Sequence, residues 1–72
     1  MPTTEQQIID AIDRAVQNGM DAADGDPNSP VYYECTAMSL LMIADEEHID
    51  LEGNAQAQQI IAEGKASCYR QG

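Results

Sequence analysis

Apolar residues recur at helical spacing along the first third of the chain. Gaps of three and four residues place such side chains on one side of a helix. They stand at Ile8, Ile9, Ile12, Ala15, Val16, Met20 and Ala23. Thr4 with Gln7, and equally Thr3 with Gln6, has the spacing of a capping box at a helix start. The pattern predicts a helix over about residues 4–24.

A turn-rich segment, DGDPNSP at residues 24–30, interrupts this pattern. Ser29 followed by Pro30 favours a new helix start, because the hydroxyl caps the helix and the proline ring suits its first turn. Residues 30–47 are then apolar on more than one side. One stripe holds Val31, Cys35, Met38 and Met42, and much of the rest holds Tyr33, Ala37, Leu40, Leu41 and Ala44. Such a helix is buried on several sides, so we expect it at the centre of the fold.

The segment IDLEGN, residues 49–54, predicts a second connection. Asn54 is a suitable cap for a third helix over about residues 54–70. Its expected inner face holds Ala57, Ile60, Ile61, Gly64 and Cys68. Three helices with short connections predict an all-α fold, a small three-helix bundle running up, down and up. The length of 72 residues predicts a single helical domain, residues 1–72.

Two glycines stand inside the predicted helices. Gly19 follows Asn18 and could end the first helix as a C-terminal cap, but the apolar pattern continues past it. We therefore expect a bend or a frayed turn there. Gly64 costs about 1 kcal/mol relative to alanine in a helix interior. We expect it to allow a neighbouring backbone to approach closely.

The charge balance narrows the choice of partners. Thirteen acidic residues face three basic ones, for a formal net charge of −10. Direct binding to nucleic acid needs Lys and Arg to neutralise phosphates, so neither nucleic acid nor an anionic membrane is an expected partner. The expected partner is a basic protein surface. The start, MPTTEQQ, lacks the basic and apolar regions of a signal peptide, and a cytoplasmic location is expected.

The carboxylates fall into two groups. At about 100° per residue, one stripe opposite the isoleucines of the first helix holds Asp10, Asp13, Gln17, Asp21 and Asp24. The second group holds Asp45, Glu46, Glu47, Asp50 and Glu52. A solvated face explains where these residues stand but not their common sign, since an ordinary surface mixes both charges. A face of one sign is typical of electrostatic steering or binding.

These features predict a non-enzymatic inhibitor that imitates a nucleic acid. A row of carboxylates would occupy the Arg- and Lys-lined groove of a nucleic-acid-handling protein. In size, acidity and helical content the chain is similar to small phage-encoded inhibitors of bacterial defence, such as anti-CRISPR and anti-restriction proteins. This similarity is one of composition. The expected binding residues are Asp10, Asp13, Asp21, Asp24, Glu46, Glu47, Tyr32 and Tyr33.

Two alternatives remain open. One is a homodimeric interaction adaptor with an apolar interface, because small domains with few aromatic residues often need a partner subunit. Tyr32, Tyr33 and Tyr69 are expected at one end of the bundle, and tyrosine is favoured at interfaces. The other is a degenerate EF-hand-like calcium loop.

The EF-hand resemblance rests on Asp24, Asp26 and Asn28, which occupy loop positions one, three and five. Position six is Ser29 in place of glycine, and position twelve is Cys35 in place of glutamate. The turn glycine and the bidentate glutamate are what make such a loop bind calcium. An acidic turn is the better interpretation, and no metal site or cofactor is expected.

The two cysteines are expected to lie close together. In an antiparallel hairpin that turns near residue 51, Cys35 and Cys68 stand at nearly the same height, since each residue adds about 1.5 Å. They form either a pair of packed thiols or a disulfide. The one histidine, His48, follows an acidic run, and no motif for catalysis accompanies it.

Overall fold

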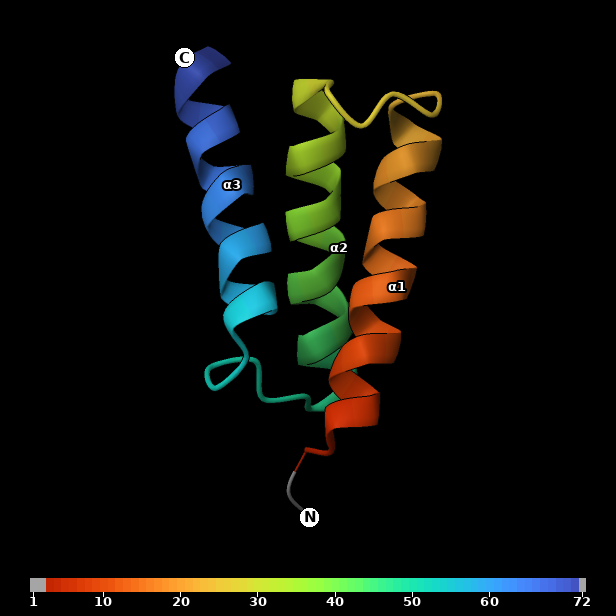
Figure 1. Ribbon diagram of the computed structural model, residues 1–72, viewed down its shortest axis with the longest axis vertical. Helices are drawn as coiled ribbons and strands as arrows, with labels where there is room; N and C mark the ends of the chain where they lie inside the picture. Colours follow the sequence, from red (N-terminus) through yellow and green to blue (C-terminus); the bar gives the residue numbers. More distant parts are fainter. Residues whose placement is uncertain (1–2, 72) are drawn as a thin grey trace.

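Three helices make up the fold of the computed structural model, which describes residues 3–71 and the side chains of residues 3–67. They are α1 (Glu5–Ala22), α2 (Pro30–Glu47) and α3 (Ala55–Gln71). Figure 1 shows them side by side, with α2 in the middle and antiparallel to both neighbours. No strand occurs in the described part of the chain. The predicted all-α, up-down-up bundle is confirmed.

Side-chain caps begin all three helices where the sequence predicts them. Of the two possible capping boxes, the chain uses Thr4 with Gln7. The Gln7 amide donates to Thr4 Oγ1 at 3.2 Å, and the Thr4 amide donates to Gln7 Oε1 at 2.8 Å. Ser29 Oγ accepts from the Val31 amide at 3.2 Å. Asn54 Oδ1 accepts from the Ala57 amide at 2.9 Å. Each cap satisfies amides that a helix start leaves without a partner.

The first helix ends earlier than predicted. It stops at Ala22, whereas the sequence pattern predicts it to about Asp24. Asp24 and Gly25 both have left-handed backbones, with φ of 53° and 80°. Two such residues in succession cannot continue a right-handed helix. Asp24 therefore belongs to the turn and not to α1.

The two interior glycines lie where α2 meets its neighbours. A Cβ on Gly19 would stand 2.9 Å from the Tyr32 carbonyl oxygen and would overlap the Thr36 side chain. A Cβ on Gly64 would stand 3.0 Å from the Tyr33 carbonyl oxygen and would overlap the Ala37 side chain. The close approach predicted for Gly64 is confirmed. Gly19 is buried inside α1, so it is a packing residue and not the end of the helix.

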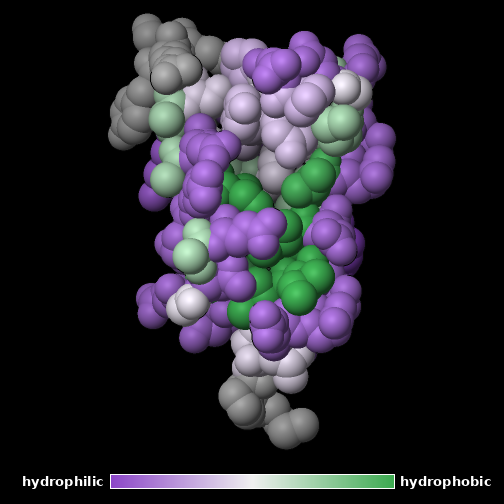
Figure 2. All heavy atoms as spheres, viewed as in Figure 1, coloured by the Kyte–Doolittle hydropathy of each residue, from purple (hydrophilic) through white to green (hydrophobic). Residues whose placement is uncertain are grey.

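The core combines alanines with isoleucines and leucines. Leu40 of α2 is the one large side chain among the described residues that is completely buried. The buried cluster around it holds Ala11, Ile12, Ala15, Ile43, Ile49, Leu51 and Ala57. On the face seen in Figure 2, hydrophobic atoms gather along the middle, while hydrophilic atoms cover both sides. The alanines let the helices pack at short range around these larger side chains.

The central helix is less buried than the sequence predicts. Its buried residues are Thr36, Ala37, Leu40 and Ile43, which take up one side of the helix. Its stripe of Val31, Met38 and Met42 is exposed, and so is Leu41. The expectation of core positions for Met38 and Met42 is wrong. Within the described residues α2 packs extensively against α1 and α3, and no further element covers its remaining face.

Replacing either packing glycine with alanine tests the close approach. Helix propensity alone favours alanine by about 1 kcal/mol, whereas an extra methyl group in a packed contact costs about 1–3 kcal/mol. We expect Gly19→Ala and Gly64→Ala each to lower the free energy of unfolding by about 1–2 kcal/mol in urea denaturation.

The matched control is Gly53→Ala, because a Cβ there would meet nothing within 4 Å. We expect it to change the free energy of unfolding by less than about 0.5 kcal/mol. Stabilisation by Gly19→Ala and Gly64→Ala, as at an exposed helix site, would show that α2 does not approach its neighbours closely.

The residue that ends α2 offers a second test. His48 has a left-handed backbone with φ of 55°, and its amide donates to the Ala44 carbonyl. A left-handed backbone costs a non-glycine residue about 1–2 kcal/mol, and glycine avoids this cost. Glycine also gives the unfolded chain more conformational freedom, which offsets part of the gain in stability. We expect His48→Gly to raise the free energy of unfolding by about 0.5–1 kcal/mol in thermal denaturation. Destabilisation would mean that the helix continues through His48.

Candidate functional site

The candidate site is an acidic surface on the outer side of α1, formed by Asp10, Asp13 and Asp21. All three residues are exposed. The opposite side of α1 is fixed in the core by Ala11, Ile12 and other buried residues. The carboxylates therefore extend from a helix whose orientation is set by packing. Asp24, the fourth residue predicted for this stripe, is exposed in the following turn, where its backbone no longer follows the helix.

The hydrogen bonds on this surface leave its charge uncompensated. Gln6 Nε2 donates to Asp10 Oδ1 at 2.9 Å, and Gln17 Nε2 donates to Asp21 Oδ1 at 3.2 Å. Both donors are neutral amides one helical turn before their acceptors. Such pairs support the helix by about 0.2–0.5 kcal/mol each and orient the carboxylates without neutralising them.

Arg14 connects the acidic surface to the second acidic group. Its guanidinium forms an ion pair with Glu47 at the end of α2. More than two fifths of each side chain is exposed, 56% and 46%, so the pair contributes at most about 1 kcal/mol. Its structural effect is to hold Glu47 beside α1. Glu47 thus lies beside the middle of α1, whereas Asp21 and Asp24 lie at the far end of that helix.

The two tyrosines lie at the other end of α2. Tyr32 and Tyr33 follow its first residue, and their ring centroids are 5.3 Å apart in an edge-to-face arrangement. Glu46 and Glu47 are the last two residues of α2, a whole helix length from the tyrosines. The structure therefore does not bring the tyrosines and these glutamates into one site. Tyr69, the third tyrosine expected there, lies outside the residues whose side chains are described.

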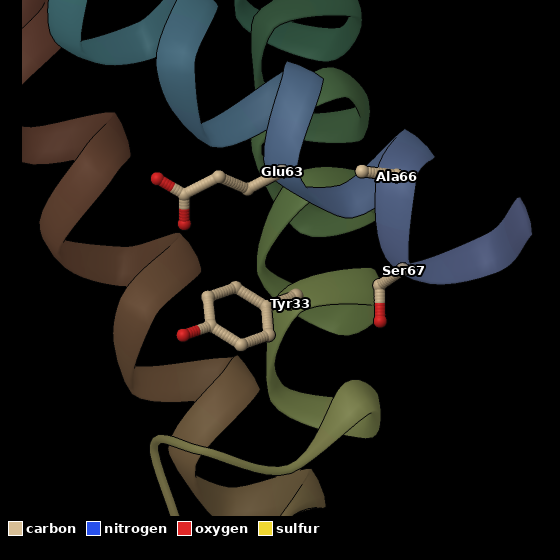
Figure 3. Close-up of a pocket in the computed structure, with 4 residues that line it drawn as sticks. All are labelled: Tyr33, Glu63, Ala66 and Ser67. Carbon is tan, nitrogen blue, oxygen red and sulfur yellow. The ribbon is translucent and has the colours of Figure 1, made fainter. Parts of the chain in front are cut away.

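A shallow hollow of about 390 Å³ opens beside Tyr33 and is lined by Glu63, Ala66 and Ser67 of α3. Figure 3 shows the side chains of Tyr33 and Glu63 extending into the space in front of α2. Ser67 Oγ donates to the Pro30 carbonyl at 3.4 Å, which joins α3 to the start of α2. The hollow brings together a phenol and a carboxylate, and its lining holds no histidine or thiol.

The turn with the EF-hand resemblance uses its ligand candidates for local structure. Asp26 Oδ1 accepts from the Asn28 amide at 3.0 Å, which closes a turn typical of aspartate. Among the described residues, no group of three or more His, Cys, Asp or Glu side chains is arranged to hold a metal ion. The acidic-turn interpretation accounts for the geometry of this segment.

The cysteine prediction stays untested. Cys35 is half-buried on α2, whereas the side chain of Cys68 lies outside the described residues. His48 is exposed, and its backbone ends α2.

Sequence reasoning missed one surface, the exposed apolar face of α2. The sequence did contain a signal for it: α2 is apolar on nearly all sides, but the chain has only two other predicted helices to cover it. Val31, Met38, Leu41 and Met42 are 40%, 64%, 47% and 59% exposed. Four large apolar side chains on one helix exceed the isolated exposed residues that are normal on a protein surface.

Within the described residues, no helix is long and apolar enough to cross a membrane. A scan against protein-family models finds no match, and searches of the curated proteins and of the solved structures likewise find none.

Proposed function

We propose that this chain is a non-enzymatic binding protein whose acidic surface occupies a basic, nucleic-acid-binding surface of another protein. The observation that carries the proposal is the exposed row of Asp10, Asp13 and Asp21 on one side of an ordered helix. Like charges held close together lower the stability of the folded protein. A partner of opposite charge would compensate for that repulsion.

The geometry of α1 suits guanidinium and ammonium partners. Asp10 and Asp21 are eleven residues apart, which corresponds to about 16 Å along the helix axis. Carboxylates accept two parallel hydrogen bonds from an arginine, as phosphates do. A groove that contacts several successive phosphates can therefore contact several of these side chains at once.

The proposed role is that of an inhibitor, since a bound carboxylate row excludes nucleic acid from the same groove. Such a role resembles that of phage-type anti-CRISPR or anti-restriction proteins, and its target would be met in the cytoplasm. Complementary charge would raise the association rate and make it sensitive to salt.

Charge reversal on the acidic surface tests this proposal. The protein is immobilised, and nuclease-treated bacterial lysate is passed over it in 0.1 M salt. We expect captured nucleic-acid-binding proteins to elute by about 0.5 M salt, because screening weakens contacts between exposed charges. Added duplex DNA should displace the same proteins. Asp13→Lys with Asp21→Lys should abolish the capture.

The matched control is Glu52→Lys with Glu63→Lys, which changes the net charge equally at two exposed residues outside α1. We expect this control to keep most of the captured protein. If both variants lost capture equally, capture would depend on the net charge of the protein and not on the acidic surface of α1. Capture that persists in Asp13→Lys with Asp21→Lys, or that duplex DNA does not displace, would contradict the proposal.

A further inference from the structure

Within the described residues, a second surface is left uncovered, namely the apolar face of α2 formed by Val31, Met38, Leu41 and Met42. Met38 and Met42 are 64% and 59% exposed, more than any other large apolar residue described. Spacings of seven and four residues place Val31, Met38 and Met42 on one stripe, opposite Leu40. These side chains thus form a continuous row on the side of α2 that faces away from the core.

A groove between α2 and α3 widens this apolar face. It has a volume of about 240 Å³, and Met38, Leu41 and Ile61 form its walls. Ala37 and Gly64, which meet at the close contact of the two helices, also line it. The groove adds a recess into which a large apolar side chain of a partner can insert.

Acidic residues lie at the edge of the groove and at one end of the apolar face. Glu34 lies on the edge of the groove. Asp45 and Glu46 follow Met42, and helical spacing places one of them on each side of the stripe. That end is also the C-terminus of α2, where the helix dipole adds partial negative charge. Lys65 is the one basic residue that lines the groove.

These charges argue against a second copy of the chain as the occupant. An antiparallel pair of α2 helices centred near residue 40 would place Glu34 of one copy beside Asp45 and Glu46 of the other. A parallel pair would place each of these acids beside its own equivalent. Both arrangements bring like charges together around an apolar contact, which disfavours association.

We propose that the apolar face of α2 binds a basic amphipathic helix of another protein. Val31 and Met42 are eleven residues apart, so the face accommodates about 16 Å of helix, or three turns. The partner would present apolar residues at spacings of three and four to the face, and Lys or Arg to the acids around it. Methionine suits such a surface because its flexible side chain adapts to different apolar partners. This surface is separate from the acidic surface on α1.

The probe for this proposal is a fluorescent 18-residue peptide of leucine and lysine arranged to form one apolar and one basic helix face. A scrambled peptide of the same composition has the same charge but no apolar face. Fluorescence anisotropy gives both dissociation constants at 0.1 M salt. We expect the amphipathic peptide to bind at least about tenfold more tightly than the scrambled one, and to gain helicity on binding.

Two pairs of variants locate the bound peptide. Met38→Gln with Met42→Gln should weaken binding at least tenfold, whereas Ile9→Gln, at a 41% exposed residue of α1, should leave it unchanged. Glu34→Gln with Asp45→Asn should weaken binding and reduce its salt dependence. The control, Glu52→Gln with Glu63→Gln, removes equal charge at two exposed residues outside both proposed surfaces and should have a smaller effect. Circular dichroism and melting temperature confirm that each variant is folded.

Three results would overturn the proposal. Equal affinity for the amphipathic and scrambled peptides would show attraction by charge alone. Equal affinity of the Met38→Gln, Met42→Gln variant and the Ile9→Gln variant would place the peptide elsewhere. Sedimentation of the wild type as a dimer that Met38→Gln with Met42→Gln dissociates would identify a second copy as the occupant. None of these results bears on the acidic surface of α1, which has its own test.

Discussion

The short distance between α2 and its two neighbours is the constraint on which this fold depends. The buried core holds only a few large side chains around Leu40, so close packing of the helices has to add to the stability that their burial provides. Gly19 and Gly64 allow that packing on two sides of the same helix. The Gly19 contact also has a cost, because Thr36 Oγ1 is buried there without a hydrogen-bond partner among the described residues. An unsatisfied buried hydroxyl costs about 1–3 kcal/mol, a large share of the stability of so small a domain.

This packing arrangement decides which surfaces remain available to partners. Because α1 contacts α2 through one side only, its carboxylates extend outward from a fixed helix. Because α1 and α3 take up one part of the circumference of α2, no other element in the described part of the chain covers the stripe that holds Met38 and Met42. One chain thus presents a charged surface on its first helix and an apolar one on its second. The acids around the apolar face extend the same negative field to both, so a basic partner suits either surface.

Features encoded by neighbouring residues were predictable, and features set by packing were not. The caps at Thr4, Ser29 and Asn54 follow from local hydrogen bonding, and the extent of α2 was predicted to the residue. The end of α1 was predicted two residues too late, because the spacing of apolar residues carries no information about the left-handed turn at Asp24 and Gly25. The exposure of Met38 and Met42 was missed for a different reason. A sequence shows that a helix is apolar all round, but the number of neighbours that cover it depends on the tertiary arrangement.

The most direct test of this account is a proton nuclear Overhauser spectrum of the wild-type protein. The close helix contacts predict strong cross-peaks from the Gly64 α-protons to the Ala37 methyl group, and from the Gly19 α-protons to the Thr36 side chain. It also predicts slow amide exchange along the middle of all three helices. Absence of both sets of cross-peaks, with amides of α3 exchanging as fast as those of an unfolded chain, would contradict it.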